Sequence, residues 1–315
     1  MSGILSYLIS FSIKAGIFAI LTLGLNLQWG FTGLFNVGIA GFFAVGAYTT
    51  AFLTKGPSPE HLGGLGLPVI IGLLGSALFS GIIAFLIGLP VLKLREDYLA
   101  MATLGIAESI RLVFTNESWL SNGNRGIKDI PKPWTDLSAS EYHNLLFLLV
   151  ILVIIILIYL FIEKNIHSPW GRVIKAIRED ELVTASAGKN VFRYKLESLV
   201  IGSMFMGLAG GLYSHYISFI SPDVFQPMQW TFLVWVMLII GGSGNNRGAL
   251  LGALLVLAVW SGTEDLIMWF FSNPETAEKV SNIQGPLRII IISIVLELVL
   301  LFRPEGIFGE KKKIF

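Results

Sequence analysis

The 315-residue chain contains no cysteine, and charged residues make up only 14% of it. Without cysteine it can form no disulfide, thiolate nucleophile or cysteine-based metal site. A soluble domain carries roughly 25% charged residues, whereas here 54% of the residues are hydrophobic and the mean hydropathy is +0.74. The composition therefore predicts a membrane protein throughout its length.

Catalytic and nucleotide-binding motifs are missing as well. The four histidines, at 61, 143, 167 and 215, are scattered without the spacing of metal ligands, and no G-x-S-x-G elbow is present. Gly188-Lys189 is followed by Asn190 rather than Ser or Thr, so it does not end a P-loop. We expect no enzyme, no metal and no cofactor, and any ATP-driven transport would need a separate ATPase subunit.

Nine apolar segments follow one another, and each is roughly long enough to span or half-span a bilayer. They cover about 4–27, 30–53, 67–92, 98–114, 145–162, 197–220, 229–241, 247–270 and 286–302. The pattern predicts an all-α, polytopic membrane protein with about 9–10 transmembrane helices in a single domain over 1–315. Lys14 interrupts the first apolar run and no basic region precedes it, so we expect no cleavable signal peptide.

The polar interval at residues 163–197 carries seven lysines and arginines. Cytoplasmic loops are enriched in these residues, so we place this loop in the cytoplasm. The alternation of spans then gives 14 basic residues to cytoplasmic segments: Lys93 and Arg95, the seven of the loop, Arg247, Arg303 and Lys311 to Lys313. The outer segments hold five, namely Lys55, Arg125, Lys128, Lys132 and Lys279. This bias predicts the orientation and a cytoplasmic tail over 303–315.

The second apolar segment is rich in glycine, with Gly30, Gly33, Gly38, Gly41 and Gly46. Such a segment is typical of a discontinuous helix beside a translocation path. Small residues also serve tight helix packing, and both interpretations stay open. If the segment re-enters or splits, there are ten crossings instead of nine, so the side of the N-terminus is open too. We predict Gly33, Gly38 and Gly41 as residues of the path.

One pair of ionisable residues is expected within a span. Glu108 and Arg111 lie three residues apart on the expected helix 98–114, where they share a face and can pair. Because ionisable groups within spans are costly, Glu108 is a further candidate for the path, with a structural pair as the alternative.

An outer loop over about 115–144 is longer than typical connections. Its tryptophans and prolines favour an ordered cap, which suits contact with a delivery protein or an ordinary membrane interface.

Residues 169–188 predict two short amphipathic helices within the 163–197 loop. Ser168-Pro169 is a typical helix start, and Gly188 is typical of the C′ position that follows a helix end. Two such helices between transmembrane helices suit docking in a groove of a partner. The loop is therefore the strongest indication of function in the sequence.

Glu181, Ala185 and Gly188 are spaced as in a relaxed form of the Glu-Ala-Ala…Gly coupling motif of ABC importer permeases. The surrounding GRVIKAIREDELVTASAGKNVFRYKL closely resembles the LivM-type permease subunits of branched-chain and neutral amino acid ABC importers. Further resemblances lie in the right order at 94–114, 121–127, 208–225, 241–253 and 302–309. The departures are Thr184, where a small Ala is typical, and Asn122, where Gly is more usual.

The resemblance implies a type II-like ABC importer permease, multi-pass in the bacterial inner membrane, for branched-chain or other neutral amino acids. Its implied partners are a paired LivH-like permease, two ABC ATPase subunits, a periplasmic amino-acid-binding protein and the lipid bilayer, with no nucleic acid. It also implies that Arg172, Glu181, Ala185 and Gly188 belong to an ATPase-coupling loop. It identifies no side chain that contacts substrate and leaves the exact substrate range open. The alternatives are the permease of a related urea importer and a stand-alone secondary transporter, which would not need the docking loop.

Overall fold

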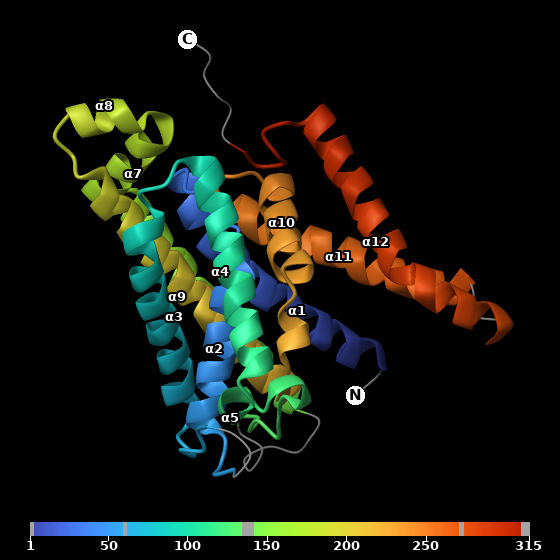
Figure 1. Cartoon of the computed structure of the whole chain (residues 1–315). Coiled ribbons are helices and arrows are strands. Elements are labelled where there is room, and N and C mark those ends of the chain that lie inside the picture. Colours follow the sequence, from blue (N-terminus) through green and yellow to red (C-terminus); the bar gives the residue numbers. More distant parts are fainter. Residues whose placement is uncertain (1–2, 59–61, 134–141, 271–273, 310–315) are drawn as a thin grey trace.

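The computed structural model describes residues 3–58, 62–133, 142–270 and 274–309, which form a bundle of helices (Figure 1). Each of the nine predicted apolar segments contains a helix. The long helices are α1 (Gly3–Leu25), α2 (Ile39–Thr54), α3 (Val69–Val91), α4 (Glu96–Asn116), α6 (His143–Ile166), α9 (Val191–Ile217), α10 (Leu233–Gly241), α11 (Asn246–Phe270) and α12 (Pro274–Phe302). Six helices of the described part are long and apolar enough to cross a membrane. The predicted all-α, polytopic fold is thereby confirmed.

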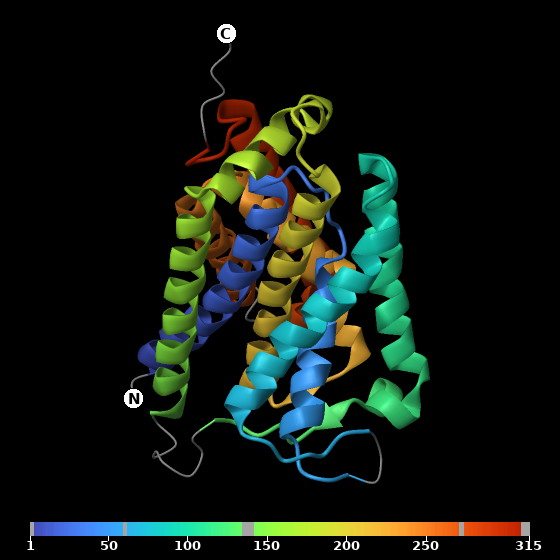
Figure 2. The ribbon, with the colours of Figure 1, turned by 90° about the vertical axis from the view of Figure 1, so that its left-hand side faces the viewer.

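Short elements occupy the two ends of the bundle. The helices α7 (Pro169–Glu179) and α8 (Glu181–Ser186) lie at one end, and the segment that follows α12 returns to the same end (Figures 1 and 2). At the opposite end lie α5 (Ser118–Ser121) and two short antiparallel strands, β1 (Ile127–Lys128) and β2 (Phe219–Ile220). Residues 310–315 of the predicted tail, together with His61 and Trp134, lie outside the described residues.

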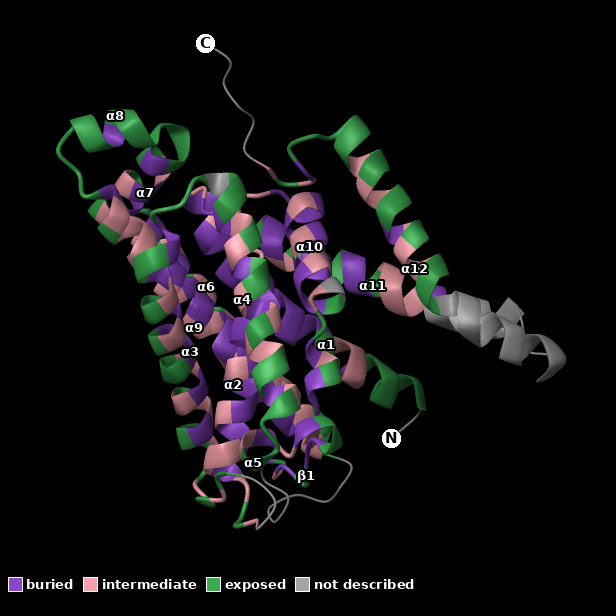
Figure 3. Ribbon diagram, viewed as in Figure 1, coloured by how far each residue is buried: buried purple, intermediate pink, exposed green. Residues whose placement is uncertain are grey.

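The helices differ greatly in how far they are buried (Figure 3). In α1 and its continuation, 72% of the most apolar 18-residue stretch is buried, whereas the corresponding shares are 22% in α6 and 6% in α12. The outward faces of α3 and α6 carry exposed large apolar residues such as Ile70, Leu74 and Ile156. Apolar side chains on such faces are stable in lipid, so the burial pattern is that of a helix bundle surrounded by membrane.

Small residues bring the central helices into close contact. A Cβ added to Gly46 of α2 would collide with the Gly207 carbonyl of α9, and one added to Gly210 would collide with the Phe43 carbonyl. Close approach of backbones through glycine is a common way of packing helices in lipid, where hydrophobic burial gives little drive for association. The α2–α9 contact therefore fixes α2 against the core.

The glycine-rich segment is discontinuous, as one of the two interpretations predicted. Helix α1 passes into a π-helical turn (η1, Asn26–Phe31), Gly33 follows with φ +75, and the chain has no regular secondary structure up to the start of α2 at Ile39. The π-helical turn lies beside α7, and α2 ends at Thr54, toward the opposite end. The irregular segment and α2 together make a single pass along the bundle.

Candidate functional site

The α7–α8 pair begins and ends at the residues that the sequence predicted. The Ser168 hydroxyl accepts a hydrogen bond from the Gly171 amide at 3.4 Å, with Pro169 as the first helical residue. The Asp180 carboxylate accepts one from the Val183 amide at 2.9 Å and so caps α8. Gly188 has φ +76 just beyond α8, a conformation that glycine adopts at little cost. The predicted helix start at Ser168-Pro169 and the predicted turn at Gly188 are confirmed, whereas the cap that Asp180 provides between the two helices was not predicted.

The exposed surface of the α7–α8 pair carries two large apolar side chains among charged ones. Helix α7 buries Gly171, Ile174 and Ile177 against the bundle, but α8 buries only Thr184. Leu182 and Val183 are 80% and 64% exposed. Apolar side chains that stand out of a polar loop mark a surface for a partner.

The four residues predicted for the coupling loop all lie on this surface. Arg172, Glu181, Ala185 and Gly188 are exposed. Arg172 also lines a groove of about 490 Å³ between α7, α8 and the start of α9. Glu181 forms an ion pair with Lys195 of α9. Thr184, where a small Ala is typical, is the buried residue of α8 and donates its hydroxyl to the Asp180 carbonyl at 2.8 Å.

Helix α7 contacts the discontinuity directly. The Arg178 guanidinium donates a hydrogen bond to the Gly30 carbonyl in the π-helical turn. The Lys175 ammonium lies 5.7 Å from the centroid of the Phe31 ring. A Cβ added to Gly33 would lie 3.3 Å from the Arg178 Cα atom, so Gly33 lies against α7. The exposed α7–α8 loop and the broken segment are thus in physical contact.

Buried polar side chains hold the broken segment to α9. The Gln28 amide group donates to the Leu199 carbonyl at 2.9 Å, and its oxygen accepts from the Asn36 amide at 2.8 Å. The Asn36 oxygen in turn accepts from the Gly38 amide at 2.7 Å. Unpaired polar groups are costly within a membrane, and these bonds satisfy both the side chains and part of the freed backbone.

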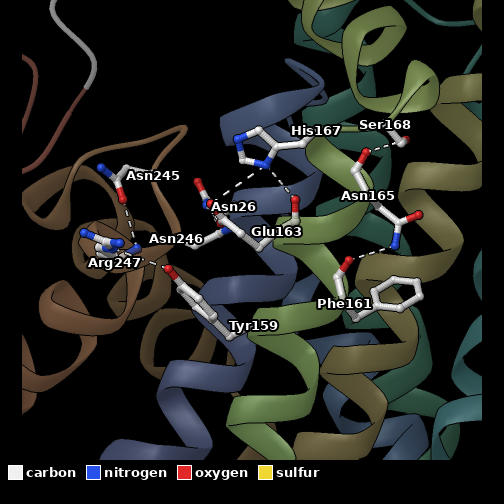
Figure 4. Close-up of polar contacts among 10 residues, drawn as sticks. All are labelled: Asn26, Tyr159, Phe161, Glu163, Asn165, His167, Ser168, Asn245, Asn246 and Arg247. Atoms are coloured by element: carbon white, nitrogen blue, oxygen red, sulfur yellow. Dashed lines mark hydrogen bonds and ion pairs between the residues drawn. The ribbon is translucent and has the colours of Figure 1, made fainter.

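A second polar network joins three helices at the α7 end (Figure 4). The Asn26 amide donates to the Asn246 oxygen at 3.0 Å, and the Asn246 amide donates to Glu163 at 2.8 Å. Gly244, in the turn between α10 and α11, donates its amide to Asn26 at 2.9 Å. The end of α1, the start of α11 and the end of α6 are therefore fixed to one another. No group of three or more potential metal ligands occurs among the described residues.

An open groove of about 710 Å³ lies between the broken segment, α4, α10 and the end of α12. Three aromatic residues form one wall: Trp29, Phe35 and Trp235, whose ring centroids lie 4.7 to 5.3 Å apart. The Trp235 indole donates to the Asn36 carbonyl at 3.1 Å. At the start of α2, Thr231 accepts from the Ala40 amide at 3.2 Å. The groove is mainly apolar, and its polar lining residues are Thr231, Ser243 and Glu305.

None of the predicted path residues Gly33, Gly38, Gly41 and Glu108 is among the residues that line this groove. A Cβ added to Gly38 would lie 2.9 Å from the Thr103 carbonyl oxygen, and one added to Gly41 would lie 2.8 Å from the Ala107 Cα atom, so both glycines pack against α4. The predicted pairing of Glu108 with Arg111 is confirmed, with Nε 2.9 Å from Oε2. The aromatic wall was missed, although Trp29 and Phe35 on either side of Gly33 were a usable signal.

Comparison with known proteins gives a consistent set of relatives. Residues 7–300 match the family described as branched-chain amino acid transport system / permease component. The high-affinity branched-chain amino acid transport system permease protein LivM of Salmonella typhimurium is 35% identical over 263 residues, which cover 76% of this chain and 60% of that protein. The probable branched-chain amino acid transport permease protein LivM of Methanocaldococcus jannaschii is 29% identical, over 94% of this chain and 91% of that protein.

A more distant similarity reaches the second type of permease. The high-affinity branched-chain amino acid transport system permease protein LivH of Salmonella typhimurium is 21% identical over 93% of this chain and 91% of that protein. The chain thus spans about three fifths of the Salmonella LivM protein but nearly all of the archaeal LivM and of LivH. No solved structure matches the chain.

Proposed function

Because the chain belongs to the family of branched-chain amino acid transport permeases, we propose that it is the LivM-type permease subunit of an ABC importer in the cell's inner membrane. Its cargo would be branched-chain or other neutral amino acids. It would work with a LivH-like permease, two ATPase subunits and an extracytoplasmic amino-acid-binding protein. The observation that carries this proposal is the capped α7–α8 pair, which exposes Leu182 and Val183 on the basic end of the bundle.

The α7–α8 pair is better suited to binding an ATPase subunit than to serving as a simple connection between helices. Full burial of a Val or Leu side chain contributes about 1.5–3 kcal/mol, so Leu182 and Val183 would stabilise a complex substantially. Arg172, Glu181, Ala185 and Gly188 would form the rest of the contact. The bond from Arg178 to Gly30 would then carry movement of the dock to the discontinuity. ATP hydrolysis itself would occur on the separate subunits.

The aromatic groove is the best candidate for the translocation path. Its apolar wall suits an aliphatic side chain, while backbone groups beside a helix break can bind the ammonium and carboxylate of an amino acid. The open side adjoins α12, which is little buried within this subunit. We propose that the LivH-like permease covers this side, with Gly38 and Gly41 setting the distance between α2 and α4. Glu108 would lie toward the outer mouth of the same path, and Gly33 would join the path to α7.

The proposal is tested by placing charge on the exposed surface of α8. We expect the double variant Leu182→Glu, Val183→Glu to lose the ATPase subunits on co-purification while the permease pair still inserts. Binding would bury two carboxylates of α8 against the ATPase subunit, and their desolvation is costly. Leu94→Glu is a matched control, since Leu94 is 46% exposed in another loop at the same end. Equal recovery of ATPase with both variants would refute the assignment. Uptake of labelled leucine, alanine and urea then separates amino acid from urea transport, and the apolar groove favours leucine.

A further inference from the structure

Basic residues are scarce at the α5 end of the molecule, yet three of them gather in one place. Of the five lysines and arginines that the sequence assigns to the outer side, Lys55, Arg125 and Lys128 line a single pocket of about 380 Å³. The other lining residues among those described are Asn122, Gly126 and Asp129, so the described lining carries three cations and one carboxylate. Arg125 and Lys128 are exposed, and Lys55 is half-buried. The clustering is local, because the outer segments as a whole carry little positive charge.

The loop that carries Arg125 and Lys128 is fixed in a strained shape. Asn122 and Asp129 have φ +64 and +57, in the left-handed region that side chains seldom adopt. A Cβ added to Gly126 would collide with the Ile220 carbonyl, because β1 pairs closely with β2. Ile127, within β1, is fully buried. Beyond β1, the Ile130 amide donates to the Ser218 carbonyl at 3.2 Å. The pocket is thus a preorganised concave site and not a chance meeting of flexible side chains.

Such a site attracts anions. Like charges held together in a concavity repel one another unless an anion compensates them, and the field of such a cluster extends into solvent and speeds association with an oppositely charged partner. None of the lining residues is apolar. A free branched-chain amino acid would therefore leave its side chain without apolar contact, so the pocket does not suit the cargo.

The position of the pocket distinguishes a protein partner from a lipid. Lys55 follows the end of α2, Lys128 lies in β1, and the other lining residues lie between α5 and β1 or directly after β1. All six therefore lie beyond the ends of the long helices, away from the apolar faces that meet acyl chains. A carboxylate that reaches this place comes most directly from a soluble protein approaching the outer end of the bundle.

We propose that the basic pocket is a docking site for carboxylate side chains on the surface of the extracytoplasmic binding protein. This inference rests on the proposed function, because it names the surface through which the importer receives its binding protein. Arg125 can hold a carboxylate with two parallel hydrogen bonds, and Lys55 and Lys128 add charge on either side. Asp129 opposes the same partner and limits the affinity, which allows the binding protein to leave after delivery.

The test measures binding of the leucine-loaded binding protein to the assembled importer in nanodiscs of phosphatidylcholine. We expect Arg125→Glu and Lys128→Glu each to raise Kd about tenfold or more and to flatten its dependence on salt, since charge reversal replaces attraction by repulsion. Lys128→Arg keeps the charge and should leave Kd within about twofold. Asp129→Asn removes the opposing charge, and Asn tolerates the left-handed conformation, so Kd should fall. If the charge reversal at Arg125 prevents folding, Arg125→Gln is measured in its place, with assembly checked by gel filtration.

The possible results are distinct. Equal Kd values for wild type, Arg125→Glu, Arg125→Gln and Lys128→Glu would overturn the inference while leaving the proposed function intact. An effect that occurs only in nanodiscs containing phosphatidylglycerol, and not in neutral lipid, would make the pocket a lipid headgroup site and would overturn it as well. If the binding protein neither binds the wild-type importer nor stimulates its ATPase activity, the proposed function itself fails.

Discussion

Replacing Arg178 by methionine separates the dock from the broken segment with little change in side-chain bulk. In the structure the guanidinium donates to the Gly30 carbonyl, and the stem of the side chain lies beside Gly33. Methionine keeps the contact with Gly33 and removes the hydrogen bond. Uptake should fall relative to ATP hydrolysis, because the ATPase subunits still bind α8 but no longer move the discontinuity.

The size of the effect follows from the bond that is lost. A hydrogen bond to a charged group contributes about 1.5–3 kcal/mol, and the lower end applies here because Arg178 is an exposed residue. About 1.4 kcal/mol corresponds to a factor of ten in an equilibrium. We therefore expect amino acid uptake per ATP hydrolysed to fall by up to about tenfold in Arg178→Met.

The assay is uptake of labelled leucine into proteoliposomes, with phosphate release measured on the same vesicles. Arg193→Met is the matched control: Arg193 lies on the neighbouring helix α9, its side chain is 74% exposed, and it pairs with Glu197 without contacting the discontinuity. Exposed ion pairs contribute little to stability, so this variant should behave as wild type. If Arg178→Met transports as many molecules per ATP as Arg193→Met, the contact between α7 and η1 does not transmit coupling.

Two further predictions concern glycines. Gly41→Val should reduce stability in detergent by an amount typical of overpacking, about 1–3 kcal/mol, and should also lower uptake per folded molecule. Gly105→Val on α4 is the control and should do neither, because nothing lies within 4 Å of an added Cβ. Reduced yield with unchanged uptake per molecule would make Gly41 a packing residue only. Gly188→Trp should abolish uptake while the protein still inserts. Gly188→Asn should retain most of the uptake, because Asn tolerates the positive φ of this position. Equal uptake by the two variants would show that the turn after α8 does not contribute to the surface that binds the ATPase.

The features that could be predicted from the sequence are those written in local patterns. Apolar runs give the spans because a helix in lipid must satisfy its own backbone. Ser168 and Gly188 mark helix ends because capping depends only on neighbouring residues. The glycines of the second segment left two interpretations open, and the structure shows both: the chain is broken at Gly33, and Gly38 and Gly41 pack tightly on α4.

The parts that could not be predicted depend on contacts between distant residues. Trp235 donates to the Asn36 carbonyl across 199 positions, and Arg178 reaches Gly30 across 148. Such pairs leave no periodic pattern in the sequence, so neither the place of Trp235 in the groove nor the link from α7 could be predicted. The basic pocket is similar: Lys55 and Arg125 read as scattered charges until the loops bring them together.

The deep burial of α1 also constrains the order in which the molecule can be completed during synthesis. This helix leaves the ribosome well before its neighbours in the bundle, which include α6, α9, α10 and α11 and follow more than a hundred residues later. Asn26 and Gln28 at its end find their partners on α11 and α9. Until then these amides need water, which is available only where the span meets the membrane surface. Membrane insertion therefore requires α1 to be apolar enough to stay in lipid without its partner helices. Its polar end must remain at the membrane surface until α9 and α11 insert.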